Sequence, residues 1–461
     1  MFIQLAKGVI FTIISTGVFA AMFISADADE IQKNLENQRN FNAIQHVYQK
    51  GVPHTDGKAV PMDSYVAGKS FLPIAMWGAP NPGEYWGEKI DWKVLQDAGL
   101  NTVWPWAGSV ATSLKSGNDF GMKIILMGEI KPEDLKQYKD DPALFGNVWM
   151  DEPIGGYGSR DMNKLFDEFQ AYRKLVHKTI PGLPVFVNDA PWIMEPAKNT
   201  WVKWNTCAEI SCHDNYPIMD STARAKSIGA NPNGIPQSVG LAVAVNKEDK
   251  PVWLIVGGFD QPGEYGQSFP FRYATPEQLR ACVYAGIIHG ATGIAYFIWD
   301  NYVPRDGAVI GMSPNPKVAY VPNPQKEGYT KPTPASPIQM IKSKALWETM
   351  AEVNSELKTL TPNILSPTVG NDFKYSLDIV GTAPTDTPIR CLMKPDPSGG
   401  YVLLSVNLDD AVLKVTYTMP KEVKSAETMF ENRQPEKLSK DSKSFTLTYA
   451  PFDTHIVRIN F

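Results

Sequence analysis

The 461-residue chain has few cysteines and lacks several motifs that would assign its chemistry directly. None of its four cysteines belongs to a C-x-x-C pair and no H-E-x-x-H motif occurs, so a zinc site has little support. A G-x-S-x-G nucleophile elbow is also absent, which argues against a serine hydrolase. We therefore expect a protein that uses neither a metal nor another cofactor.

The composition also lacks an excess of basic charge. Lysine and arginine total 44 against 49 aspartates and glutamates, the net charge is −5, and no basic block stands out. Nucleic acid is therefore not an expected partner. The hydrophobic fraction of 43% is typical of a folded globular protein, and the length favours two domains. The 12 Trp and 18 Tyr are also numerous enough to supply rings that stack on sugars.

The four cysteines comprise one close pair and two isolated residues. Cys207 and Cys212 are near enough in sequence to form a small disulfide in an exported protein. Cys282 and Cys391 each stand in an apolar segment, and we expect both to be buried thiols.

The N-terminus has the pattern of a targeting segment. After Lys7, the stretch Gly8–Ile24 is continuously apolar or small, and Ala26-Asp27-Ala28 fits an A-x-A cleavage site. We expect a signal peptide, residues 1–28, and a secreted or periplasmic protein. The alternative is an uncleaved anchor, because the run is long for a signal peptide and short for a membrane span. Only in that case would a membrane be a partner.

A regular rhythm of short apolar strands and helices follows, after residues 29–69, which we interpret as an N-terminal helix (Glu30–Gln49) and a lead-in loop. Strands buried on both faces have continuous apolar runs, and eight of them predict a (β/α)8 TIM barrel over residues 70–364. A helix from Ile338 to Leu360, ended by Thr361-Pro362, would close it. The expected strands are Phe71–Trp77, Asn101–Trp106, Met122–Met127, Leu144–Met150, Pro184–Val187, Glu209–Cys212, Pro251–Val256 and Gly293–Trp299.

The pattern changes after Leu365 to an alternation of apolar and polar residues. This alternation predicts a small all-β antiparallel sandwich over residues 365–461. Its expected strands are Tyr401–Asn407, Leu413–Thr418, Ser444–Tyr449 and His455–Phe461. The fold class is thus α/β, a barrel followed by a β-sandwich, and the sequence leaves the oligomeric state open.

The fourth expected barrel strand ends in Asp151-Glu152-Pro153, and the barrel is organised around this point. The carboxyl ends of barrel strands form the active face, and an acid held among apolar neighbours tends to have a raised pKa. Glu152 is therefore our candidate general acid. The plainer alternative is a carboxylate that is solvated in a turn or paired with a basic residue.

This plan resembles the retaining (β/α)8 glycoside hydrolases of clan A, including bacterial members with a C-terminal β-sandwich. The resemblance covers Phe71–Phe461 and rests on Asp151-Glu152-Pro153, Asp214–Pro217 and Tyr296–Trp299. It implies that Glu152 is the acid/base, although Asp151 stands where the clan usually has Asn. The nucleophile it implies is a Glu at the end of strand seven, but this chain has Gly257-Gly-Phe-Asp260 there.

The second carboxylate has two candidates. By analogy with the clan we rank Asp260 first as nucleophile, and Asp214, beside Tyr216, is the alternative as base or as a hydrogen-bonding partner of a sugar hydroxyl. Asp151 could raise the pKa of Glu152 by like-charge repulsion. An adjacent Asp-Glu pair also occurs in substrate-assisted enzymes acting on N-acetyl sugars, which need no enzymic nucleophile.

The remaining candidates for substrate binding are polar and aromatic residues at the strand ends. Aromatic rings there could stack on sugars, and packing in the core is the ordinary alternative. These candidates are Trp77, Trp106, Asp151, Asn188, Tyr216, Gln261 and Trp299.

The favoured function is an exported glycoside hydrolase that cleaves O-glycosidic bonds in a polysaccharide or oligosaccharide. The alternative is a non-catalytic carbohydrate-binding or cell-surface protein on a degenerate barrel, favoured by the missing strand-seven Glu. In both cases the expected partner is a carbohydrate.

Overall fold

The computed structural model describes most of the chain beyond its N-terminal segment. The described residues are 47–53, 71–85, 88–105, 108–155, 161–218, 227–231, 233–260, 271–299, 309–314, 317–318, 333–334, 336–368, 375–385, 387–435 and 441–461. All belong to the second of two compact units, which span residues 1–45 and 46–461. The expected signal peptide, most of the helix Glu30–Gln49, and the candidates Trp106 and Gln261 lie outside the described residues.

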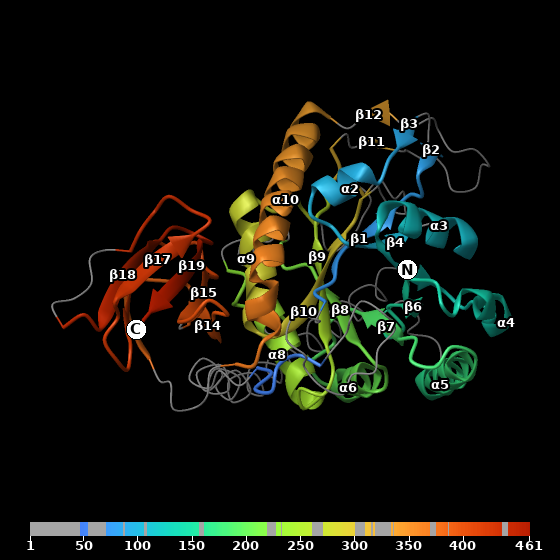
Figure 1. Ribbon diagram of the computed structural model, residues 1–461, viewed down its shortest axis with the longest axis horizontal. Coiled ribbons are helices and arrows are strands. Elements are labelled where there is room, and N and C mark those ends of the chain that lie inside the picture. Colours follow the sequence, from blue (N-terminus) through green and yellow to red (C-terminus); the bar gives the residue numbers. More distant parts are fainter. Residues whose placement is uncertain are drawn as a thin grey trace, which may run out of the picture. The chain divides into compact units, whose positions relative to one another are not determined.

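Eight parallel strands form a closed barrel (Figure 1), which confirms the predicted fold class. Each strand pairs with its neighbours in chain order, and the first strand closes the barrel by pairing Ile74 with Ile294 of the last. The strands are β1 (Ile74–Ala79), β4 (Thr102–Pro105), β5 (Lys123–Met127), β6 (Leu144–Asp151), β7 (Val185–Asp189), β8 (Ser211–Asn215), β9 (Val252–Gly257) and β10 (Ala291–Phe297).

Helices connect these strands along the chain. The helices are α2 (Lys93–Asp97), α3 (Val110–Phe120), α4 (Pro132–Leu135), α5 (Met162–Thr179), α6 (Lys198–Thr206), α8 (Ile235–Val245), α9 (Pro276–Ile288) and α10 (Pro337–Leu365), with a 3-10 turn η1 at Lys136–Tyr138. Thr275 and Gln278 form a capping box at the start of α9, as its sequence predicts. The prediction that Thr361-Pro362 ends the last helix is wrong, because α10 continues through Pro362 to Leu365.

Aromatic side chains fill the barrel interior. Phe145 of β6 stacks on Trp253 of β9 with ring centroids 5.7 Å apart, and Phe186 of β7 meets the same indole edge-on at 5.3 Å. Because β6 and β9 are not neighbours, the stacked pair lies across the lumen. Gly293 of β10 makes room for the indole: a Cβ there would lie 2.5 Å from a Trp253 carbon. Side chains therefore fill the barrel interior below its active face.

Two antiparallel sheets follow the barrel and share one apolar core, as expected for a sandwich. One sheet has the order β13-β16-β18 and the other β14-β15-β19-β17. The strands are β13 (Ser376–Val380), β14 (Ile389–Pro395), β15 (Tyr401–Asn407), β16 (Leu413–Thr418), β17 (Ser425–Met429), β18 (Ser444–Tyr449) and β19 (Thr454–Asn460). Four of them match the predicted strands, and β13, β14 and β17 were not predicted. The exact domain boundaries stay a prediction.

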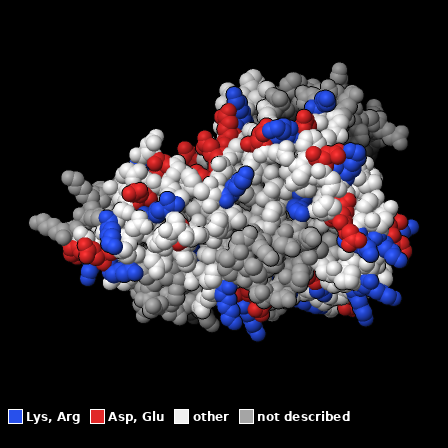
Figure 2. Space-filling model, in the orientation of Figure 1, with Lys and Arg blue, Asp and Glu red and all other residues white. Residues whose placement is uncertain are grey.

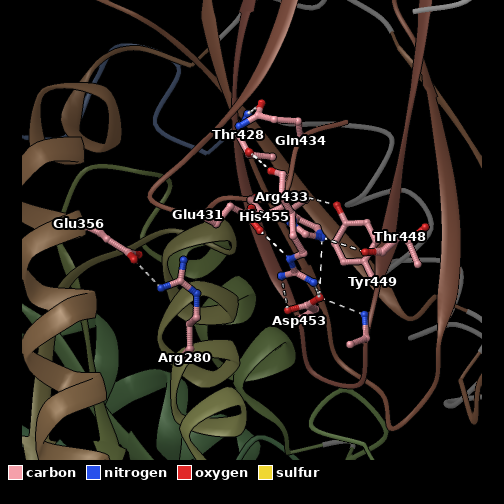
Figure 3. Close-up of polar contacts among 12 residues, drawn as sticks. Arg280, Glu356, Thr428, Glu431, Arg433, Gln434, Thr448, Tyr449, Asp453 and His455 are labelled. Atoms are coloured by element: carbon pink, nitrogen blue, oxygen red, sulfur yellow. Dashed lines mark hydrogen bonds and ion pairs between the residues drawn. The ribbon is translucent and has the colours of Figure 1, made fainter. Parts of the chain in front are cut away.

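Ion pairs lie on both sides of the junction between helices and sheets (Figure 3). Arg280 of α9 binds Glu356 of α10 at 2.6 Å. After β17, Glu431 accepts a hydrogen bond from the buried His455 at 2.7 Å, and Arg433 binds Asp453 through two nitrogens at 2.6 and 2.9 Å. These pairs fix α9 to α10 and the β17 turn to β19.

The surface carries charges of both signs. On the face shown in Figure 2, the basic side chains are scattered in small groups among acidic ones.

Two small ladders, β2 (Gly83–Tyr85) with β3 (Glu88–Ile90) and β11 (Lys317–Val318) with β12 (Thr333–Pro334), complete the regular structure. Over the part of the chain that the structure describes, no helix has the length and apolar character to cross a membrane.

Candidate active site

Strand β6 brings the Asp151-Glu152 pair to the carboxyl edge of the barrel. Asp151 is its last residue, and Glu152 follows with a φ of +43°, a left-handed conformation that is rare for a residue with a side chain. The Glu152 amide donates to the carbonyl of Asn188 on β7 at 2.8 Å, and Pro153 is buried behind it. Backbone strain of this kind collects at functional sites.

Asn188 links two carboxylates. Its side-chain amide donates to Asp151 Oδ1 at 2.9 Å and to Asp214 Oδ1 at 3.2 Å. The bridge follows from the register, since Asn188 pairs with Asp151 on one side and with Cys212, two residues before Asp214, on the other. The structure therefore places Asp151, Glu152, Asn188 and Asp214 together, on three adjacent strands.

Asp189 adds a fourth carboxyl group that was not among the candidates from the sequence. It is fully buried at the end of β7, and its Oδ2 accepts the backbone N–H of Ile154 at 3.1 Å. This bond holds the segment that follows Glu152 against β7. Burial raises the pKa of Asp189 to about 8, although the N–H groups of Ile154 and Ala190 oppose the shift. Its position directly after Asn188 at a strand end was the signal available in the sequence.

The four carboxyl groups shift one another's proton affinity. Repulsion from Asp214 is the largest cause of the raised pKa of Glu152, followed by burial and by the charges of Asp151 and Asp189. Burial, then the charge of Asp151, raises the pKa of Asp214. Partial desolvation raises the pKa of Asp151, and the hydrogen bond from Asn188 opposes this. The cluster therefore retains protons at a pH where ordinary carboxyl groups are ionised.

Hydrogen bonds decide which member of the Glu152–Asp214 pair carries the proton. The carboxylate of Asp214 accepts hydrogen bonds from Asn188 and from the Tyr216 hydroxyl, and both lower its pKa. The four leading influences on the pKa of Glu152 all raise it. The arrangement favours a protonated Glu152 together with an ionised Asp214, which is the pairing that acid catalysis beside a nucleophile or base requires.

Tyr216 anchors an aromatic cluster beside the carboxylates. Its ring lies 5.1 Å from Phe259, 5.7 Å from Phe271 and 5.7 Å from Phe297, measured between centroids. A small pocket opens here, lined by Tyr216, Pro217, Ile218, Gly257, Phe259, Phe271, Arg272 and Cys282. The candidate Tyr216 thus orients Asp214 and lies at an apolar recess.

Asp260, the other candidate for the second carboxylate, has surroundings that differ from those of Asp214. Its backbone forms an isolated antiparallel bridge with Ile310, with N···O distances of 3.0 and 2.9 Å. Its Oδ2 accepts a hydrogen bond from Gln339 of α10 at 3.2 Å. The leading influences on the pKa of Glu152 come from Asp214, Asp151 and Asp189. Asp260 as nucleophile stays a prediction, and Asp214 is the carboxylate whose charge raises the pKa of Glu152 most.

Two of the three expected tryptophan platforms lie among the described residues, and both are packed in the fold. Trp77 has 1% of its surface exposed and lies edge-on to Trp104, with centroids 4.5 Å apart. Trp299 is buried against Trp347 of α10 at 5.2 Å. Both rings therefore have a packing role, and stacking on sugar stays a prediction for them. Trp192, which the sequence did not single out, is 42% exposed in the loop after β7.

The cysteines are all free thiols, so the disulfide considered for Cys207 and Cys212 is not formed. Cys207 lies at the end of α6 and donates to the Trp204 carbonyl at 2.9 Å, whereas Cys212 is buried within β8. Cys282 and Cys391 are buried as expected. Among the described residues, no group of three or more His, Cys, Asp or Glu is arranged to hold a metal ion.

Comparisons with known proteins address the fold. No protein-family model matches the sequence, and no curated protein is significantly similar to it. Among solved structures, a catalytic mutant of a family 42 beta-galactosidase from G. stearothermophilus has a TM-score of 0.50 at 7% identity, covering 86% of this chain and 100% of the other.

Two further solved structures are less similar. An exo-carrageenase of family 42 from Bacteroides ovatus has a TM-score of 0.47 at 10% identity, over 94% of this chain and 88% of the other. A family 5 glycoside hydrolase from Bacteroides vulgatus has a TM-score of 0.46 at 13% identity, over 89% and 93%. The family 42 structure with a TM-score of 0.50 supports the fold alone, and the closed barrel agrees with the fold that the resemblance implied.

Proposed function

We propose that this protein is a glycoside hydrolase in which Glu152 is the general acid and Asp214 is the second carboxylate. The observation that carries the proposal is the carboxylate cluster at the ends of β6, β7 and β8, in which Asn188 bridges Asp151 and Asp214 and the charge of Asp214 is the largest cause of the raised pKa of Glu152. Glycoside hydrolysis needs this combination of one protonated and one ionised carboxyl group.

The chemistry follows from the two protonation states. Glu152 gives its proton to the glycosidic oxygen as the bond from that oxygen to the anomeric carbon breaks. Asp214 then either bonds to the anomeric carbon or takes a proton from the water that does so. Asn188 and Tyr216 hold Asp214 through hydrogen bonds, so its oxygens have a fixed direction. Where Asp214 has bonded to the anomeric carbon, water then breaks that bond, leaves its hydroxyl group on the sugar and returns a proton to Glu152. Where Asp214 has taken a proton from the attacking water, it releases this proton to solvent and Glu152 regains one from solvent.

The substrate class proposed is a polysaccharide or oligosaccharide outside the cytoplasm. Export is supported by the apolar stretch Gly8–Ile24 followed by the A-x-A pattern at Ala26–Ala28. Substrate-assisted cleavage of an N-acetyl sugar is a variant of the same proposal, in which Asp151 beside Glu152 would orient the acetamido group.

A carbohydrate-binding protein without catalysis is the second candidate. It is favoured by the end of β9, where Gly257-Gly258-Phe259 precedes Asp260 and no Glu stands at the position of the clan's nucleophile. This candidate predicts glycan binding with no release of reducing sugar.

The test is a screen of polysaccharides and aryl glycosides with three proteins: wild type, Glu152→Gln and Glu168→Gln. Glu168 is an exposed residue of α5 and provides the matched control for the loss of one carboxylate. The proposal expects hydrolysis by wild type and Glu168→Gln and its loss in Glu152→Gln. Equal activity of all three would reject Glu152 as the acid, and binding without hydrolysis by wild type would favour the second candidate.

A further inference from the structure

Trp192 is an exposed aromatic side chain at the active face of the barrel. Most Trp and Phe side chains of the described residues are packed, but Trp192 is 42% exposed and Phe430, in the C-terminal sheets, is 43% exposed. Exposing an indole forgoes its large apolar burial, so such a ring marks a place where a ligand gains by covering it.

The indole lies against the loop that carries the candidate acid. A Cβ placed on Gly155 would lie 3.2 Å from Cζ2 and 3.3 Å from Nε1 of Trp192, so the ring rests on the glycine backbone. Gly155 follows Glu152 by three residues, which span at most about 11 Å of chain. Asp189 binds the intervening Ile154 amide at 3.1 Å and lies three residues before Trp192. The indole thus packs on the loop that follows Glu152, at the β6 and β7 ends.

The loop holds the ring in place before any ligand arrives. The amide of Trp192 donates to the carbonyl of Ala190 at 2.8 Å, and the amide of Ile193 donates to that of Pro191 at 2.8 Å. These are consecutive three-residue turns. Ile193 is buried, and Asp189 on the other side is the last residue of β7. A rigid aromatic face costs little conformational entropy when it binds.

We propose that Trp192 is a sugar-binding platform that stacks on a pyranose ring of an oligosaccharide or polysaccharide lying across the β6 and β7 ends. This inference rests on the proposed function, because it concerns the same cleavage site. The ring's exposed face supplies apolar contact to the C–H groups of the sugar, and the carboxylates around Asn188 supply acceptors for its hydroxyl groups. Gly155 lets the indole lie close to the backbone, because a Cβ at that position would lie 3.2 Å from the ring.

The test compares Glu152→Gln, which should not turn over its ligand, with the same protein carrying Trp192→Ala, Trp192→Phe or Phe430→Ala. Phe430→Ala controls for the loss of an equally exposed aromatic side chain away from the barrel. The probes are cellotetraose, xylotetraose, mannotetraose and galactotetraose. Binding to every variant is measured by titration calorimetry, and protection of tryptophan fluorescence from acrylamide reports separately whether a bound sugar covers Trp192.

At least one tetrasaccharide should protect tryptophan fluorescence from acrylamide, and this protection should be absent in Trp192→Phe. Trp192→Ala should weaken its binding by about 10-fold, Trp192→Phe should weaken it less, and Phe430→Ala should leave it unchanged. Any one of three results would overturn the platform. These are an unchanged affinity in Trp192→Ala, binding that does not protect tryptophan fluorescence, and no binding of any of the four tetrasaccharides.

The failure of the platform and of the hydrolase proposal can be told apart by adding Trp192→Ala to the hydrolysis screen. If binding depends on Trp192 but wild type hydrolyses no substrate, the platform proposal stands and the hydrolase proposal is rejected. If Glu152→Gln loses hydrolysis while Trp192→Ala keeps the wild-type KM, the hydrolase proposal stands and the platform proposal is rejected. The platform predicts a raised KM on oligosaccharides with kcat nearly unchanged.

Discussion

Replacing Glu152 with glutamine should make the protein more stable at neutral pH. In the folded protein, the charge of Asp214, burial, and the charges of Asp151 and Asp189 oppose ionisation of Glu152 and raise its pKa. An unfolded chain exposes Glu152 to water, where its pKa is near 4.5. Glutamine keeps the shape of the side chain and is uncharged without binding a proton, so the free-energy cost of protonating Glu152 on folding is removed.

The sign and size follow from proton binding. Between pH 4.5 and the raised pKa, the folded state binds more protons than the unfolded state, so the free energy of unfolding of the wild type falls as pH rises. Below pH 4.5 the penalty is absent, because Glu152 is protonated in both states. Each unit of pKa shift corresponds to about 1.4 kcal/mol, so at pH 7 Glu152→Gln should be the more stable protein by about 1–3 kcal/mol.

Urea unfolding followed by tryptophan fluorescence at several pH values between 4 and 8 measures this difference. The advantage of Glu152→Gln over wild type should be near zero at the acid end and grow as pH rises, whereas Glu168→Gln should show no such trend. A Glu152→Gln protein that is equally or less stable than wild type at pH 7 would refute the claim that the cluster opposes its ionisation.

Two further predictions concern the second carboxylate and the barrel interior. Asp214→Asn should lower kcat by about 10²–10⁴-fold, and by more than Asp260→Asn does. The two variants are assayed side by side on any substrate found in the screen. A larger loss in Asp260→Asn would favour Asp260 as the nucleophile. Gly293→Ala should lower the free energy of unfolding by about 1–3 kcal/mol, because its Cβ would lie 2.5 Å from the Trp253 ring; an unchanged urea midpoint would show that the barrel interior can adjust.

The barrel could be predicted because its strands are buried on both faces. Continuous apolar runs such as Ile124–Met127 and Val252–Val256 identify such strands from the sequence. In the C-terminal sheets, β16 and β18 were found for the complementary reason that they alternate. β15 was also found, although it is buried continuously from Val402 to Asn407. β14 escaped detection because Arg390 and Lys394 are buried within it and interrupt the apolar pattern.

The end of α10 shows tertiary packing outweighing a local rule. Proline within a helix costs about 3 kcal/mol, and so Pro362 was expected to end it. The last turn is held instead by burial of Ile364 and Leu365 and by the Asn363 side chain, which donates to the Pro395 carbonyl at 3.0 Å. Pro395 lies about thirty residues further along the chain, so no local pattern could reveal this contact.

The site was predicted where it depends on strand ends and missed where it depends on side-chain direction. Asp151, Glu152, Asn188 and Asp214 follow from the rule that active residues occupy the carboxyl ends of barrel strands. The ranking of Asp260 above Asp214 came from analogy with the clan. The bridge that the Asn188 amide makes between Asp151 and Asp214 depends on the register of the strands, which the sequence does not show.

The most direct test of the central claim is the dependence of Glu152→Gln on the leaving group. With the sugar identified by the screen, its oligosaccharide and its dinitrophenyl glycoside are assayed with wild type and Glu152→Gln. A dinitrophenolate leaves without protonation, so a variant that lacks only the acid should cleave this glycoside while it fails on the oligosaccharide. Equal retention of activity on both substrates would contradict the assignment of Glu152 as the general acid.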